Sequence, residues 1–182
     1  MPYTQKLQKV VYHLFNPVEG QAARTTYVIL DAARDEMVYK KIQEAGHKDG
    51  CLYYGTKAEE LAEVAPYLVS LKAEDTFTEW IINTGWGNSW GIFLESLADP
   101  DQLKRHFRRF LMVYDEESEP LYFRFYDPRV FRVYLPTCNA KELETIFGPV
   151  KGYSLESKDG CLIEFSCTNE FHLIQNAVNL KG

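Results

Sequence analysis

Residues 121–135, LYFRFYDPRVFRVYL, constrain the fold more than any other stretch of the chain. Leu121–Tyr126 alternates between two faces, as a half-buried strand does. Asp127 and Pro128 then predict the start of a helix, because an aspartate accepts hydrogen bonds from free N–H groups and proline suits the first helical position. Pro136 limits how far this helix can run. The segment therefore predicts a strand that passes directly into a helix.

Three arginines lie inside this apolar segment, Arg124, Arg129 and Arg132. An arginine among aromatic side chains must reach solvent, pair with a carboxylate or bind a partner. The pattern of residues leaves these three uses open.

The composition indicates a single domain with at most a small appendage. The chain has 182 residues, of which 46% are hydrophobic and 14% aromatic, and its net charge is −6. This charge disfavours general nucleic-acid binding. No apolar run is long enough to span a bilayer or to form a signal peptide, and the four cysteines have no metal-ligand spacing. We therefore expect a cytoplasmic protein with reduced cysteines, no membrane contact and no nucleic-acid partner.

The order of predicted elements indicates a mixed α/β fold, with a central mixed sheet, flanking helices and antiparallel hairpins toward the C-terminus. We expect three parts: an N-terminal amphipathic helix and linker (1–20), an α/β domain (21–150) and a C-terminal hairpin and tail (151–182). The first helix packs on its own domain or docks a partner. The further expected strands are 26–31, 51–54, 66–71, 92–94, 112–114, 150–156 and 161–167, and the further expected helices are 34–45, 56–64, 75–85, 99–110 and 141–147.

The helix expected at 56–64 would begin with a capping box of Thr56 and Glu59. The end of the chain, 168–182, is weakly patterned and is expected to be a tail or a short helix.

The common catalytic motifs are missing from the sequence: it has no nucleophile elbow, phosphate-binding loop or zinc-protease helix. A small hydrolase or nuclease would have to use Asp31, Asp35 and His106, which must then converge in one cleft. Asp31 ends a strand, where an aspartate more often caps the following turn.

The helix expected at 99–110 has a basic outer face that includes Lys104, Arg105, Arg108 and Arg109. This face is either solvated or, together with Arg129 and Arg132, a site for an anion or an acidic partner. Trp86 and Trp90 lie in a glycine-rich loop, where they either cover the core or anchor an interface.

Several stretches in order resemble the effector-chaperone (adaptor) family of the type VI secretion system. They are 30–33 (LDAA), 51–53 with Gly55 (CLY-G), 65–69 (APYLV), 90–93 (WGIF), 106–110 (HFRRF) and 123–130 (FRFYDPRV), and they span most of residues 27–150. The resemblance implies a non-catalytic bacterial cytoplasmic protein without a cofactor, which holds a secreted effector and helps to load it onto the spike protein. Its signature residues here are Asp31, His106, Arg124, Asp127 and Pro128.

We expect a structural pair of Arg124 with Asp127 or with Asp31 in this signature. The residues expected to bind the effector are Trp86, Trp90, Arg105, Arg108, Arg109, Arg129 and Arg132. Charge reversal at both Arg108 and Arg109 is expected to weaken the complex and to leave the fold intact. The alternatives are the hydrolase or nuclease above and an inhibitory binding protein of the immunity or regulatory kind.

Overall fold

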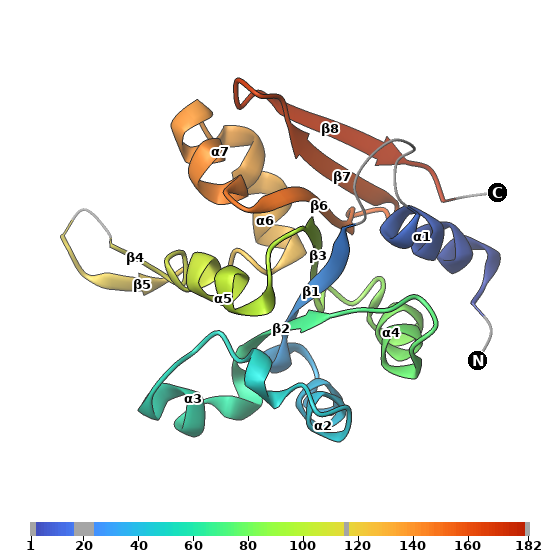
Figure 1. Ribbon diagram of the computed structural model, residues 1–182, viewed down its shortest axis with the longest axis horizontal. Coiled ribbons are helices and arrows are strands. Elements are labelled where there is room, and N and C mark those ends of the chain that lie inside the picture. The colour runs from blue at the N-terminus through green and yellow to red at the C-terminus, as the bar shows by residue number, and fades with distance from the viewer. Residues whose placement is uncertain (1–2, 17–23, 115–116, 181–182) are drawn as a thin grey trace.

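The computed structural model describes residues 3–16, 24–114 and 117–180, and these form a three-layer α/β sandwich (Figure 1). The six strands of the central sheet lie in the order β2-β1-β3-β6-β7-β8. Their bounds are β1 Thr25–Asp31, β2 Pro66–Ser70, β3 Gly91–Ser96, β6 Val150–Glu156, β7 Leu162–Cys167 and β8 Leu173–Val178. A separate hairpin is formed by β4 Met112–Tyr114 and β5 Pro120–Tyr122, and it projects from one side of the molecule.

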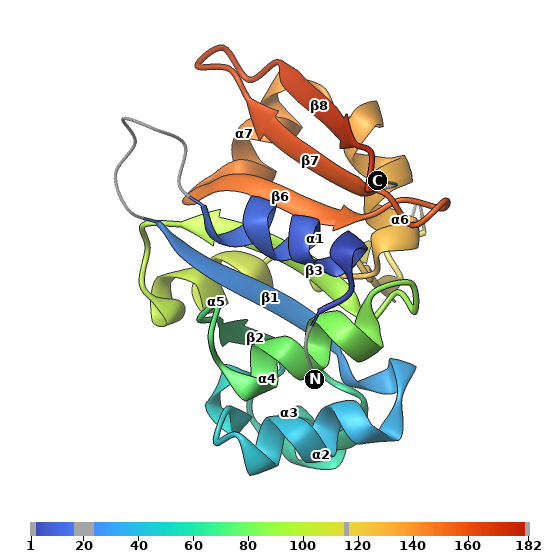
Figure 2. The same cartoon turned by 90° about the vertical axis from the view of Figure 1, so that its right-hand side faces the viewer.

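Helices cover both faces of the sheet. They are α1 Gln5–Phe15, α2 Glu36–Glu44, α3 Thr56–Glu60, α4 Thr76–Trp80, α5 Pro100–Arg108, α6 Pro128–Tyr134 and α7 Ala140–Phe147. Figure 2 shows α1 and α4 across the front of the sheet, with α5 and α7 behind it. The sheet therefore has a hydrophobic core on each side.

The alternation of side chains along β1 supplies both cores. Tyr27 and Ile29 point into the core beneath α5, α6 and α7, whereas Val28 and Leu30 point into the core beneath α1, α2 and α4. Successive side chains of a strand point to opposite faces, so a strand buried on both faces becomes continuously apolar. This accounts for the run TYVILD at residues 26–31.

The mixed α/β class and the C-terminal hairpins are confirmed, but the central sheet is not the mixed sheet that we expected. All pairings among the described strands of the central sheet are antiparallel. β2 and β3 do run in the same direction and are joined through α4, but β1 lies between them and pairs with both. Strand–helix alternation predicts such a crossover without revealing that another strand lies between its two strands.

Two local predictions near residue 55 were wrong. Residues 51–54 do not form a strand, and Cys51 makes only an isolated bridge with Tyr67 of β2. The capping box expected at Thr56 is also absent, because the N-cap of α3 is Gly55, which makes no side-chain cap bond. In addition, α3 ends at Glu60, and a separate 3₁₀ turn follows it at Ala62–Val64.

Two further differences concern strands. The strand expected over 121–126 ends at Tyr122, and both Phe125 and Tyr126 are buried because the chain turns there into α6. Residues 173–178, expected to be a tail or helix, form β8 and extend the sheet beyond β7. The weak polarity pattern of β8 reflects its position at the sheet edge, where most of its side chains are exposed on both faces.

The second and third of the expected parts, 21–150 and 151–182, share one sheet. The proposed boundary at 150–151 falls inside β6, which pairs with β3. Helix α1 packs on its own domain through Leu7, Val10 and Leu14, and His13 bonds the Glu164 carboxylate at 3.1 Å.

The four cysteines are free and half-buried. Among the described residues, no helix is long and apolar enough to cross a membrane.

Candidate partner-binding surface

Asp127 begins α6 as the sequence predicts, and it also holds Arg129. Its Oδ1 accepts the Arg129 backbone N–H at 2.9 Å, and its Oδ2 accepts from Nη2 of the same residue at 2.6 Å. The Asp127 side chain is 4% exposed and that of Arg129 is 47% exposed. Burial acts to raise the pKa of the Asp127 carboxyl, but its bonds to Arg129 outweigh burial and lower that pKa. Arg129 thus has a structural partner and an exposed edge.

Asp31 caps the turn after β1, as its place at the end of a strand indicates. Its Oδ1 accepts the Ala33 N–H at 3.0 Å. The residue is 1% exposed, and its Oδ2 makes no hydrogen bond with any described residue. Burial raises the pKa of the Asp31 carboxyl, and the positive charge of nearby Arg124 opposes that shift.

Arg124 is exposed, and its expected ion pair with Asp127 does not form, because Arg129 occupies that carboxylate. Nor does an ion pair join Arg124 to Asp31 within the described residues, and the two interact only through their charges. The reason is local: Arg129 follows Asp127 by two residues, so one guanidinium reaches both carboxylate oxygens from the first turn of α6.

The loop that contains Trp86 and Trp90 lies at the end of the sheet where β1 ends and β3 begins. Trp90 is 4% exposed and belongs to the core, which agrees with a covering role and leaves no surface for a partner. Trp86 is half-buried, and its Nε1 donates to the Gly160 carbonyl at 3.3 Å. The buried Glu156 carboxylate accepts from the backbone N–H groups of Gly87 and Ser89, which holds the loop against β6.

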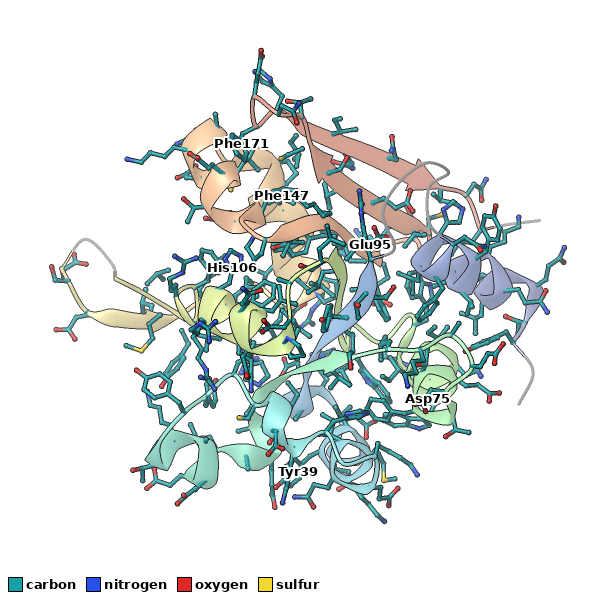
Figure 3. The ribbon with its side chains drawn as sticks, viewed as in Figure 1. Tyr39, Asp75, Glu95, His106, Phe147 and Phe171 are labelled. Atoms are coloured by element: carbon teal, nitrogen blue, oxygen red, sulfur yellow. The ribbon has the colours of Figure 1, made fainter. Side chains whose placement is uncertain are left out.

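His106 connects two helices. Its Nε2 lies 3.0 Å from the Ile146 carbonyl oxygen, and Nη2 of Arg109 lies 3.0 Å from its Nδ1. A carbonyl oxygen can only accept, and a guanidinium can only donate, so the ring is neutral with its proton on Nε2. Burial lowers the pKa of His106 to about 4, which agrees with this tautomer. Figure 3 places His106 on the side of α5 that faces α7.

The remaining arginines of the predicted site have different surroundings. Arg108 is half-buried and donates from Nε to the Leu52 carbonyl and from Nη2 to the Cys51 carbonyl, each at 3.1 Å. Arg132 donates to the Glu156 carbonyl at 3.4 Å. Arg105 is exposed and makes no hydrogen bond or ion pair within the described residues. Charge reversal of Arg108 would therefore disturb the fold, and Arg105 is the better probe of a surface contact.

The predicted binding residues did not include an exposed group of four large apolar side chains. They belong to the hairpin β4–β5, hereafter the arm, whose Met112, Val113, Leu121 and Tyr122 are 37%, 41%, 49% and 48% exposed. The alternation of residues 121–126 predicted a half-buried strand, with Leu121 on one of its two faces. Among the described residues, the arm pairs with no third strand, and these four side chains remain exposed.

The three residues of the hydrolase alternative are not brought together. Asp31 caps a turn, Asp35 caps α2 through the Met37 N–H at 2.8 Å, and both nitrogens of His106 are engaged by Ile146 and Arg109. No hydrogen bond or ion pair among the described residues joins any two of the three. In the same part of the chain, no group of three His, Cys, Asp or Glu residues is placed to hold a metal ion.

The fold and this surface define an α/β sandwich protein with an exposed apolar arm beside a basic helix. A family model described as a domain of unknown function, DUF4123, matches residues 26–145. The chain belongs to the DUF4123 family, and the matched region runs from β1 to within α7. Searches of the curated proteins and of the solved structures gave no match.

Proposed function

We propose that this protein is a non-catalytic adaptor of the bacterial cytoplasm, which binds a type VI secretion effector and promotes its loading onto the spike protein. Membership of the DUF4123 family is compatible with this role. The resemblance of the HFRRF and FRFYDPRV segments to the effector chaperones supports the same assignment.

The exposed arm is the observation that carries the proposal. A two-stranded hairpin is marginally stable alone in water. Here it also exposes large apolar side chains on both faces, with Val113 opposite Leu121 on one face and Met112 opposite Tyr122 on the other. Contiguous exposed apolar surface on a soluble protein marks an interaction site. Burial against an effector would remove this surface from water and would hold the arm in place.

Co-purification from cells that express candidate effector and spike proteins tests the proposal. The wild-type protein should recover the effector. The double variant Val113→Asp with Leu121→Asp should recover less than about a tenth as much, because the interface would bury two aspartate charges that have no partners. Ile174→Asp is the matched control, since Ile174 is 41% exposed on β8, far from the arm.

Recovery of neither an effector nor a spike protein by the wild type would contradict the adaptor role. If an effector is recovered and its toxicity is blocked, but the spike protein never joins the complex, the inhibitory alternative holds instead. Equal recovery by the arm variant and the Ile174 control would exclude the arm as the contact.

A further inference from the structure

A groove of about 350 Å³ lies at the base of the arm, between the arm, α3 and α5. Its volume lies near the lower end of the range of ligand pockets, which is about 300–1,000 Å³. Six of the residues that line it are Tyr54, Lys57, Arg108, Leu111, Met112 and Tyr122. Tyrosine, methionine and arginine are the residue types enriched at protein interfaces.

The aromatic walls of the groove are already arranged around two cations. Nζ of Lys57 bonds the Tyr122 hydroxyl and lies 4.6 Å from the centre of the Tyr122 ring. The Arg108 guanidinium lies 5.7 Å from the centre of the Tyr54 ring. Its bonds to the carbonyls of Cys51 and Leu52 fix its position, so little side-chain entropy remains to be lost when a partner binds.

The charge of the groove differs in sign from that of the whole protein. The chain has a net charge of −6, but the groove has two cations and, among the described residues that line it, no acidic side chain. A carboxylate entering the groove would meet Lys57 and Arg108 without a competing negative charge. An apolar side chain beside it would meet Leu111, Met112 and the tyrosine rings. Methionine adapts to irregular shapes, which suits a pocket for an apolar side chain.

We propose that this groove binds a segment of the effector in which an aspartate or glutamate lies within two residues of a large apolar side chain. The proposal rests on the adaptor role and specifies the chemistry of the partner. The apolar side chain fills the space between Tyr54 and Met112, and the carboxylate lies against Lys57. The exposed Tyr54, at 72%, then becomes covered and anchors the contact.

A phage-displayed library of random linear peptides, selected on the full-length protein, provides the probe. Selected peptides should combine an acidic residue with a nearby Leu, Met, Phe or Trp. Their affinity should fall at least about tenfold in Tyr54→Ala and in Lys57→Glu, as expected at interface hot spots, and it should weaken with added salt. Both substituted residues are exposed, and unchanged thermal unfolding of each variant confirms that the fold persists.

Matched controls separate the groove from the general surface. Tyr12 is 64% exposed on α1 and Lys141 is exposed on α7, so Tyr12→Ala and Lys141→Glu make the same chemical changes elsewhere and should leave peptide affinity unchanged.

Three results would overturn the proposal: no peptide enriched, enriched peptides without an acidic residue, or affinity retained in both groove variants. A labelled single-stranded oligonucleotide that binds the wild type and is lost in Lys57→Glu would also overturn it, because stacking tyrosines and cations can hold nucleic acid.

Co-purification distinguishes this proposal from the adaptor role. If the effector is recovered equally by the wild type and both groove variants, the groove assignment fails and the adaptor role stands. If the wild type recovers no effector at all, the adaptor role fails whatever the peptides show.

Discussion

His106 in α5 donates its Nε2–H to the carbonyl oxygen of Ile146 in α7, at 3.0 Å. The bond joins two helices that are separated in the chain by the arm and by α6. The ring also packs edge-on against Phe107 and Phe110, with ring centres 5.0 and 4.9 Å apart. A residue of the HFRRF segment therefore holds the core together, while Arg108 of the same helix lines the groove at the base of the arm.

We predict that acid destabilises the protein through His106. Its folded pKa of about 4 lies below the ordinary value of 6.5, so the unfolded chain binds the proton more tightly. Stability is fully present above pH 6.5 and is lost as the pH falls toward 4, by about 3 kcal/mol at most. Urea unfolding across this range should show the loss in the wild type and in His172→Gln, which alters an exposed histidine. In His106→Gln the free energy of unfolding should fall less steeply with decreasing pH, and an unchanged pH dependence would refute the assignment.

Gly148, just after α7, should not tolerate alanine. Its φ is +42°, and a Cβ there would lie 2.6 Å from Cε1 of His106. Gly46→Ala is the matched control, since Gly46 has a φ of +76° and a Cβ there would meet no atom within 4 Å. The control should lower the free energy of unfolding by about 1 kcal/mol through backbone strain alone. Gly148→Ala should lower it by more, because the new Cβ also displaces the His106 imidazole. Thermal unfolding of both variants measures the difference, and equal costs would contradict a close contact.

Arg129→Ala should destabilise the protein by about 2 kcal/mol at neutral pH. The substitution leaves the buried Asp127 carboxylate without its partner, although the exposure of Arg129 moderates the cost. The ion pair lowers the pKa of Asp127, so its contribution is present above the ordinary value near 3.8 and is lost as the pH falls. Denaturant unfolding should therefore show a smaller difference from wild type near pH 3 than at pH 7. Arg105→Ala should leave the free energy of unfolding unchanged at both pH values.

Asp31→Asn should leave the fold intact and raise its stability at pH 7. The amide oxygen can still accept the Ala33 N–H, and the substitution removes a buried charge whose Oδ2 has no hydrogen bond with the described residues. Burial raises the folded pKa of Asp31, so wild-type stability is fully present below the ordinary value of 3.8 and falls as the pH rises through the raised pKa. The gain should therefore vanish toward pH 4. Asp35→Asn, at another cap that is only half-buried, should give no such gain.

Much of the fold could be predicted because its signals are local. Asp99, Asp127 and Asn139 each accept a backbone N–H at the start of a helix, as their side chains indicate. Gly160, with a φ of +71°, lies in the turn between β6 and β7, where an Asp-Gly pair favours the hairpin expected from strands 150–156 and 161–167. β8 could not be predicted, because an exposed edge strand lacks the alternation that burial imposes.

The site was less predictable, because residue type does not reveal the partner of a side chain. Arg105, Arg108 and Arg109 look alike in the sequence, yet Arg105 is exposed without a hydrogen bond among the described residues, Arg108 bonds the carbonyls of Cys51 and Leu52, and the exposed Arg109 bonds His106. Tyr54 and Lys57 carried no signal, because only the tertiary structure places them across a groove from the arm.

The sequence by itself determined where the chain turns, caps its helices and alternates its strands, since those interactions join residues a few positions apart. It also contained the family signature. Only the tertiary structure decided that β1 lies between β2 and β3, that Arg129 rather than Arg124 holds Asp127, and that the arm stays uncovered. These outcomes depend on packing between distant segments, where the position of one side chain is set by which other segments occupy the space around it.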